Sequence, residues 1–149
     1  MKVGTFKEKR CVDFNNAKLL KERDIVFYPM ELQNKTDYVL GYEYDLEDDK
    51  DELKIREFQW EDNICSHLYL MPEISEVVNY FREKFNLFIE IRLGKDENNV
   101  WYNWSIVNAS LVVDYIKDYY ELIGGYDGCD SPNDAYNEAI RYILNAKLI

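Results

Sequence analysis

Residues 72–108, PEISEVVNYFREKFNLFIEIRLGKDENNVWYNWSIVN, contain the pattern that decides the fold. Apolar side chains recur every three or four residues from Ile74 to Phe85, which predicts a helix with one buried face. Pro72 is a residue favoured in the first turn of a helix, and Asn86 is a residue that tolerates the left-handed conformation common at helix ends. We therefore expect a helix that begins at Pro72 and ends at Asn86.

Two strands are predicted after this helix. Apolar and polar residues alternate from Leu87 to Leu93, and a polar run at residues 94–99 turns the chain back into a second aromatic, β-branched segment at residues 100–108. Alternation with period two is typical of strands, and a polar connection of this length suits an antiparallel hairpin. We expect this hairpin to form the centre of a sheet.

The first half of the chain also predicts a helix and a hairpin. Asp13 or Asn15 caps a predicted short helix whose apolar positions are Phe14, Ala17, Leu19 and Leu20. Residues 25–28 and 38–44 are rich in aromatic and β-branched residues, which indicates extended chain. Residues 53–60 alternate in the same way. The segments at 38–44 and 53–60 therefore predict an antiparallel hairpin.

The last forty residues combine an ambiguous segment with a clear helix. Residues 111–123 fit both helical and extended patterns, and the pattern alone does not decide between them. Residues 124–130, GGYDGCD, are predicted to be a loop, and Ser131 with Pro132 marks the start of a final helix. Together these elements predict an α+β fold, an antiparallel sheet with about three helices packed on it, in a single domain over residues 1–149.

The most unusual feature of the sequence is an acidic run at the predicted tip of the first hairpin. Residues 43–52 hold seven acidic residues and one lysine, a net charge of −6 in a chain whose net charge is −11. Concentrated like charge repels itself, and folding does not require it, so the run is either a solvated turn or a surface for a basic partner. The predicted partner-binding residues are this run and two tyrosines beside it: Tyr42, Glu43, Tyr44, Asp45, Glu47, Asp48, Asp49, Asp51 and Glu52.

The sequence argues against several classes of function. An acidic surface repels phosphate backbones, so we expect no direct nucleic-acid binding through the body of the protein. Cys11, Cys65 and Cys129 are too few and too far apart for a disulfide framework or a zinc site, which favours reduced thiols in the cytoplasm. We also expect no targeting segment, no membrane span, no cofactor and no metal, and we identify no catalytic residue.

Three segments resemble a family of small phage and prophage proteins. Residues 14–22, FNNAKLLKE, match an opening of the type F-x-x-A-K-L-x-K-E. Residues 72–91 are similar to a central P-x7-W-x-R-E element that runs into I-x-I-x-I, with Tyr or Phe where Trp is usual. Residues 136–144 are similar to an ending of the type Y-x-E-A-x3-A-I-x3-L. The resemblance implies a phage origin and favours a strand over residues 111–123. Because compact acidic phage proteins often inhibit host defence, it also implies an activity like that of anti-CRISPR proteins.

From charge and resemblance together, we expect a non-enzymatic inhibitor in the cytoplasm of the bacterial host. Its partner would be a host protein with a basic, nucleic-acid-handling surface, such as a CRISPR effector nuclease. The hairpin carboxylates would supply the charge, and Tyr42 and Tyr44 would anchor the contact.

Three alternatives remain open from the sequence. In the first, the chain is an accessory phage protein whose acidic hairpin only keeps it soluble. In the second, it is a small RNA-associated module, because residues 1–23 carry a net charge of +4. The cations of that module are Lys2, Lys7, Lys9, Arg10, Lys18, Lys21 and Arg23. An enzyme is third, and it would use a pocket that gathers Cys65, His67 and two carboxylates.

Overall fold

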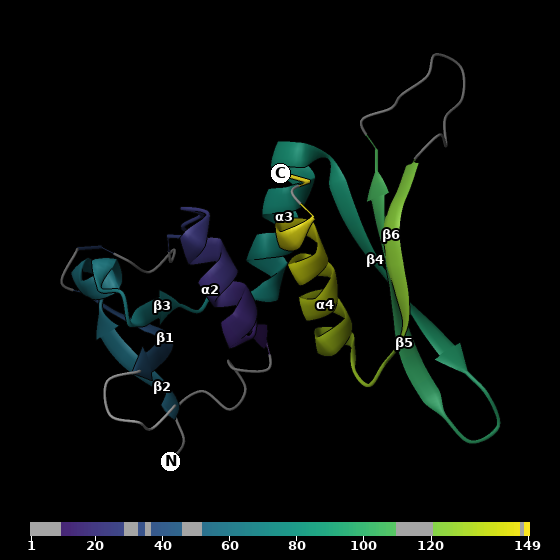
Figure 1. Ribbon diagram of the computed structural model, residues 1–149, viewed down its shortest axis with the longest axis horizontal. Coiled ribbons are helices and arrows are strands. Elements are labelled where there is room, and N and C mark those ends of the chain that lie inside the picture. The colour runs from purple at the N-terminus through teal and green to yellow at the C-terminus, as the bar shows by residue number, and fades with distance from the viewer. Residues whose placement is uncertain (1–9, 29–32, 35–36, 46–51, 110–120, 147) are drawn as a thin grey trace. The chain divides into compact units, whose positions relative to one another are not determined.

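The computed structural model describes residues 10–28, 33–34, 37–45, 52–109, 121–146 and 148–149 (Figure 1). The contacts of the chain divide it into two compact units. We name residues 11–72 the N-terminal unit, and residues 73–149 with Arg10 the C-terminal unit. The described residues form three α-helices and two three-stranded antiparallel sheets, which confirms the predicted α+β class. The single domain over residues 1–149 stays a prediction.

The N-terminal unit contains one helix, one 3₁₀ turn and one sheet. Its elements are α2 (Phe14–Glu22), β1 (Tyr38–Asp45), β2 (Glu52–Gln59), η1 (Trp60–Ile64) and β3 (Leu68–Leu70). The strand order is β2-β1-β3, so β1 is central. The predicted cap of α2 is confirmed, because the Asp13 carboxylate accepts a hydrogen bond of 3.0 Å from the backbone N–H of Asn16.

Each face of this sheet buries a different cluster. Val39, Phe58 and Leu68 form a buried apolar cluster on one face. On the other face, where α2 contacts the sheet, the Phe14 ring packs against Tyr42, Tyr44 and Tyr69 with centroid distances of 5.8, 5.3 and 5.2 Å. Because side chains alternate between the faces of a strand, Val39 and Tyr42 of β1 serve opposite clusters.

The C-terminal unit packs two helices with the second sheet. Its elements are α3 (Ile74–Phe85), β4 (Leu87–Lys95), β5 (Val100–Asn108), β6 (Glu121–Cys129) and α4 (Pro132–Asn145). The strand order is β4-β5-β6, so the predicted β4–β5 hairpin is confirmed. Its predicted place at the centre of the sheet is wrong for β4, which is an edge strand of the described sheet, because β6 pairs with the other side of β5. Helix α4 contacts all three strands and α3, and the end of the β4–β5 hairpin projects beyond it (Figure 1).

The ends of both helices in this unit follow from local sequence. Helix α3 begins at Ile74 rather than at Pro72, and Glu73 is its N-cap residue. Asn86 ends it as predicted, with the left-handed φ of 54°. Helix α4 has Pro132 in its first turn, and the Ser131 hydroxyl accepts a hydrogen bond from the N–H of Asp134 at 3.1 Å. Its buried side chains include Ala135, Ile140 and Ile143.

The loop predicted for residues 124–130 is wrong. Strand β6 runs through residues 121–129, and its glycines pair with β5, Gly125 opposite Ser105 and Gly124 opposite Ile106. The strand predicted for residues 111–123 is confirmed for residues 121–123, while residues 111–120 lie outside the described residues. Residues 25–28, predicted to be extended, belong to no strand.

None of the helices in the described part of the chain has both the length and the hydrophobicity that crossing a bilayer requires.

Candidate functional site

The predicted acidic hairpin is present as two paired strands. β1 and β2 pair antiparallel over eight residues, from Tyr38 opposite Gln59 to Asp45 opposite Glu52. The connection between them holds Glu47, Asp48, Asp49 and Asp51, which lie outside the described residues. From position 45 to position 52 the sequence has a net charge of −5, and the last described pair already opposes two acidic residues. Like charges in opposed positions destabilise a hairpin, so folding of the N-terminal unit does not account for this composition.

The negative charge of Glu43 is compensated inside the hairpin. It forms an ion pair with Arg56 and lies opposite Lys54 in the strand register. An exposed ion pair of this kind contributes about 0–1 kcal/mol to stability. The structure therefore assigns Glu43 an ion pair within the sheet.

The two tyrosines predicted to anchor a partner lie in the interior of the unit to different degrees. Tyr42 is 7% exposed, and its hydroxyl donates a hydrogen bond of 2.6 Å to the carbonyl oxygen of Val12. Tyr42 is thus a core residue, which corrects its predicted place on the binding surface. Tyr44 is half-buried against Phe14. A side chain with a satisfied hydroxyl and a packed ring does not become a contact residue without unfolding its surroundings.

Exposed apolar side chains lie instead on β2, where sequence reasoning did not place them. Leu53 is 46% exposed and Ile55 is 36% exposed. Leu53 lies opposite Tyr44 and Ile55 opposite Tyr42, so both share the face that carries the tyrosines. The signal that identifies them is their position in an edge strand, which alternation alone does not reveal.

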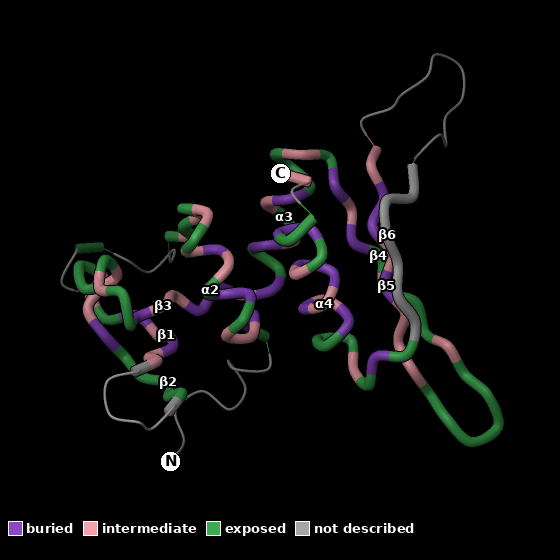
Figure 2. Tube along the Cα trace, in the orientation of Figure 1, coloured by how far each residue is buried: buried purple, intermediate pink, exposed green. Residues whose placement is uncertain are grey.

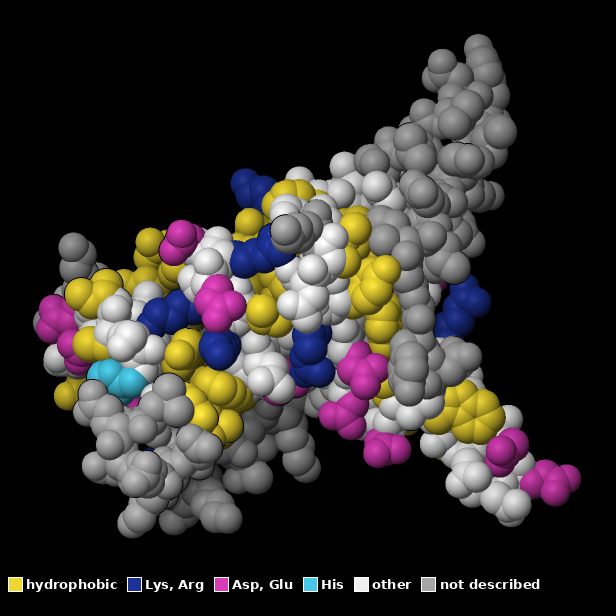
Figure 3. All heavy atoms as spheres, viewed as in Figure 1, with side chains coloured by type: hydrophobic (Ala, Val, Ile, Leu, Met, Phe, Trp, Pro, Cys, Tyr) yellow, Lys and Arg dark blue, Asp and Glu magenta, His cyan; other side chains and the backbone are white. Residues whose placement is uncertain are grey.

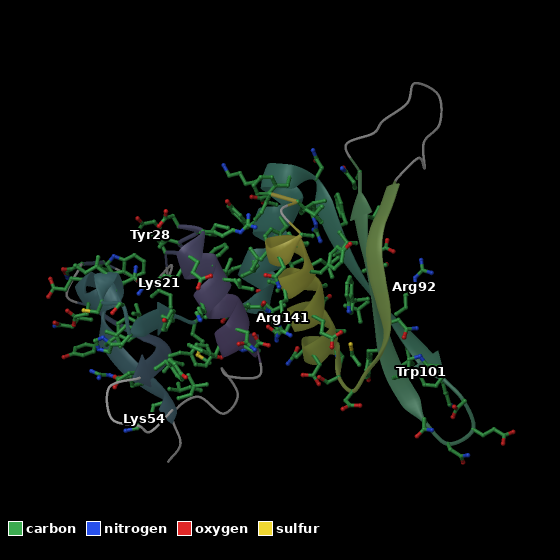
Figure 4. The ribbon with its side chains drawn as sticks, viewed as in Figure 1. Lys21, Tyr28, Lys54, Arg92, Trp101 and Arg141 are labelled. Carbon is green, nitrogen blue, oxygen red and sulfur yellow. The ribbon has the colours of Figure 1, made fainter. Side chains whose placement is uncertain are left out.

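Lys21 is bound within the N-terminal unit. Its Nζ donates hydrogen bonds to the carbonyl oxygens of Asn63, at 3.0 Å, Cys65 and Leu68, and it lies 5.0 Å from the centroid of the Tyr69 ring (Figure 4). Burial lowers the pKa of Lys21, and the nearby Cys65 acts in the opposite direction. All three ammonium protons are directed at backbone acceptors. Lys21 therefore fixes the loop between η1 and β3. The RNA-binding alternative requires Lys21 to contact phosphate, but its donors are occupied by these carbonyl oxygens.

A cavity of about 340 Å³ lies beside this lysine. Its walls include Ala17, Leu20 and Phe27, with the side chain of Ile64, 88% exposed, among the lining residues. Because the Lys21 donors are occupied by carbonyls, the cavity offers mainly apolar contacts.

The enzyme alternative names Cys65 and His67, which lie just before β3. Cys65 is half-buried and His67 is exposed. Among the residues described, no three His, Cys, Asp or Glu side chains lie close enough together to bind a metal ion.

Cys129, in the C-terminal unit, is held as a neutral thiol. Its Sγ donates to Glu138 Oε2 at 3.2 Å, and Trp104 Nε1 donates to the same oxygen at 3.1 Å. Burial, the hydrogen bond to Glu138 and the charges of Glu138, Asp134 and Asp130 raise the pKa of Cys129 to about 12. Because the thiolate is the reactive form, Cys129 is a poor nucleophile and serves to orient Glu138 against the indole.

We expect the native protein to show slow reaction of Cys129 with a disulfide reagent at pH 8. With a pKa of about 12 in place of 9.0, the thiolate population of Cys129 falls about a thousandfold. The half-buried Cys65 reacts first, so Cys65→Ser removes the fast phase of a stopped-flow trace and Cys129→Ser leaves it in place. Loss of the fast phase in Cys129→Ser would contradict this assignment.

Comparisons of the chain with protein-family models, with curated proteins and with solved structures find no match.

Proposed function

We propose that this chain is a non-enzymatic binding protein whose acidic β1–β2 connection recognises a basic, nucleic-acid-handling surface of another protein. The observation that carries the proposal is the division of charge along the hairpin. Glu43 is compensated by Arg56, whereas positions 45–52 keep a net charge of −5 at the end of a sheet whose core is made elsewhere. Such a concentration accelerates encounter with a positive surface and rejects negative ones.

A host defence nuclease, such as a CRISPR effector, is the target class implied by the resemblance to phage proteins. Guide and target channels of these nucleases are lined with Lys and Arg, so an acidic hairpin competes for the same side chains as the nucleic acid.

Charge reversal of Asp48, Asp49 and Asp51 to Lys tests the proposal against a panel of purified CRISPR effector nucleases. We expect an effector that binds the native chain to lose at least about tenfold in affinity for this variant, because three negative charges become positive. We also expect binding of the native chain to weaken between about 0.05 M and about 0.5 M salt. Calorimetric titration measures both effects, and a DNA cleavage assay measures inhibition.

The matched control reverses Asp96 and Glu97 to Lys. These residues lie in the exposed turn of the β4–β5 hairpin, where acidic side chains are visible at its projecting end (Figure 3). The control alters net charge without touching the β1–β2 hairpin, and we expect binding to be retained. Equal loss in both variants would show a dependence on net charge alone, and no binding by any effector would overturn the target class.

A further inference from the structure

The outer side of β2 is a sheet edge. β2 is the terminal strand in the order β2-β1-β3, and within the described residues no strand pairs with its other side. Residues 53–57 are all exposed, whereas Val39, Gly41 and Tyr42 of the adjoining β1 are buried (Figure 2). Residues 53–57 are therefore a stretch of edge strand that is exposed on both faces, and such a stretch is a template for another strand.

The side chains of this edge differ between its two faces. Leu53 and Ile55 make one face apolar, next to the cluster of Phe14 with the tyrosines. Lys54 and Arg56 point to the other face, and Lys54 lies at the edge of the ribbon in Figure 4. Natural sheets protect such edges with charge, bulges or covering loops, and a pair of exposed β-formers at alternate positions weakens that protection.

We propose that the partner adds an extended, basic segment to β2 as a fourth strand of this sheet. The inference rests on the proposed function and names the part of the partner that is bound. Main-chain hydrogen bonds to β2 supply the pairing, apolar side chains at alternate positions cover Leu53 and Ile55, and lysines or arginines meet the acidic residues.

The negative charge next to β2 determines which end of the partner's segment is basic. Position 52, at the start of β2, belongs to the stretch of net charge −5, so the partner's cations lie beside the N-terminal end of β2. We assign the antiparallel direction, because β1 already pairs with β2 antiparallel and antiparallel ladders are slightly more stable per residue. In an antiparallel pair, the C-terminal end of the added strand lies beside the N-terminal end of β2. The partner's cations therefore come after its apolar residues in the partner's sequence.

A synthetic peptide of three Val-Thr repeats followed by three lysines is the probe. NMR titration of the full chain measures its dissociation constant, and amide hydrogen exchange measures protection of β2. We expect the peptide to bind and to slow exchange in β2. A peptide in which Gly-Ser replaces Val-Thr has the same charge, and we expect it to bind at least about tenfold more weakly.

Backbone N-methylation separates strand pairing from simple charge attraction. Two versions of the peptide are methylated on the two alternate sets of repeat residues. Only every second N–H of an added strand points at β2, so one version should lose binding by about tenfold or more and the other should retain it. Equal binding of both methylated versions and the unmodified peptide would overturn the proposal.

Substitution of the apolar edge gives a second, independent test. Leu53→Thr combined with Ile55→Thr keeps β propensity, and we expect it to weaken peptide binding at least about fivefold. The matched control is Leu93→Thr with Val100→Thr in the β4–β5 hairpin, whose side chains are 62% and 52% exposed, and we expect it to change nothing. If both variants bind alike, β2 is not the docking edge.

The outcomes also separate this inference from the proposed function. If reversal of Asp48, Asp49 and Asp51 weakens effector binding while the β2 substitutions leave it unchanged, the acidic connection binds without strand addition and the inference falls. If the β2 substitutions weaken effector binding and charge reversal does not, the edge is the binding element and the charge-based function falls.

Discussion

Phe58→Ala is expected to lower the free energy of unfolding of the N-terminal unit by about 3 to 5 kcal/mol. Phe58 is 2% exposed and is the largest member of the cluster with Val39 and Leu68, against which Trp60 and Leu70 also pack. Removing its ring takes away the favourable free energy of burying the ring and leaves a cavity against Val39 and Leu68. Domains of this size are typically stable by only about 5 to 15 kcal/mol, so this loss is a large share of the total.

Urea denaturation combined with hydrogen exchange of β1 and β2 measures this effect. Phe58→Leu keeps most of the apolar volume, and we expect it to cost less than about 1.5 kcal/mol. Leu53→Ala, on the same strand but 46% exposed, is the surface control, with an expected cost of about 0.5 kcal/mol. A Phe58→Ala variant no less stable than Leu53→Ala would show that this face of the sheet is not the core.

Gly41→Ala is expected to destabilise the same unit by about 3 kcal/mol. A Cβ atom at Gly41 would lie 2.3 Å from the backbone oxygen of Tyr69 and 2.4 Å from a ring carbon of Phe58. The oxygen belongs to β3, which pairs with β1 through Gly41 opposite Leu70, so relief of the clash requires the strands to separate. Unlike a side chain, a paired backbone cannot rotate out of the way.

Gly94→Ala is the matched control for Gly41→Ala. The three atoms nearest to a Cβ atom at Gly94 all belong to the indole of Trp101, the nearest at 2.1 Å. Trp101 lies near the projecting end of the β4–β5 hairpin, where its ring can swing away (Figure 4). We expect a change in tryptophan fluorescence and a cost of about 1 kcal/mol or less. Equal thermal stability of Gly41→Ala and Gly94→Ala would contradict the close packing of β1 against β3.

The elements that sequence reasoning predicted well are those with local signals. Helix α3 and the β4–β5 hairpin follow from apolar spacing and a polar turn, and α4 follows from Ser131 and Pro132. The glycines of residues 124–125 gave the opposite local signal, a loop, yet they belong to β6. Glycine disfavours strands through its conformational entropy, but pairing with β5 satisfies the backbone groups and outweighs this cost. That pairing joins residues that are distant in the sequence, such as Ser105 with Gly125.

In the candidate site, too, local features could be predicted from the sequence and features that depend on distant contacts could not. The acidic run and its place between two strands could be read from residues 43–52, because composition and alternation are local properties. The role of Tyr42 could not be read from the sequence. A strand has two faces, and the pattern of its own residues does not say which other segment covers each face. Phe14 and the carbonyl of Val12, from the segment at α2, make Tyr42 a core residue, and the edge position of β2 leaves Leu53 and Ile55 exposed.

The sequence by itself determined the α+β class, the positions of the helices and hairpins, and the concentration of negative charge between β1 and β2. Only the tertiary structure decided that the strands form two sheets, that β6 completes the second, and which side chains of the acidic hairpin are buried, compensated or exposed. The physical reason is that periodicity and charge are carried by neighbouring residues, whereas strand partners, edges and the covering of a face depend on contacts between distant segments.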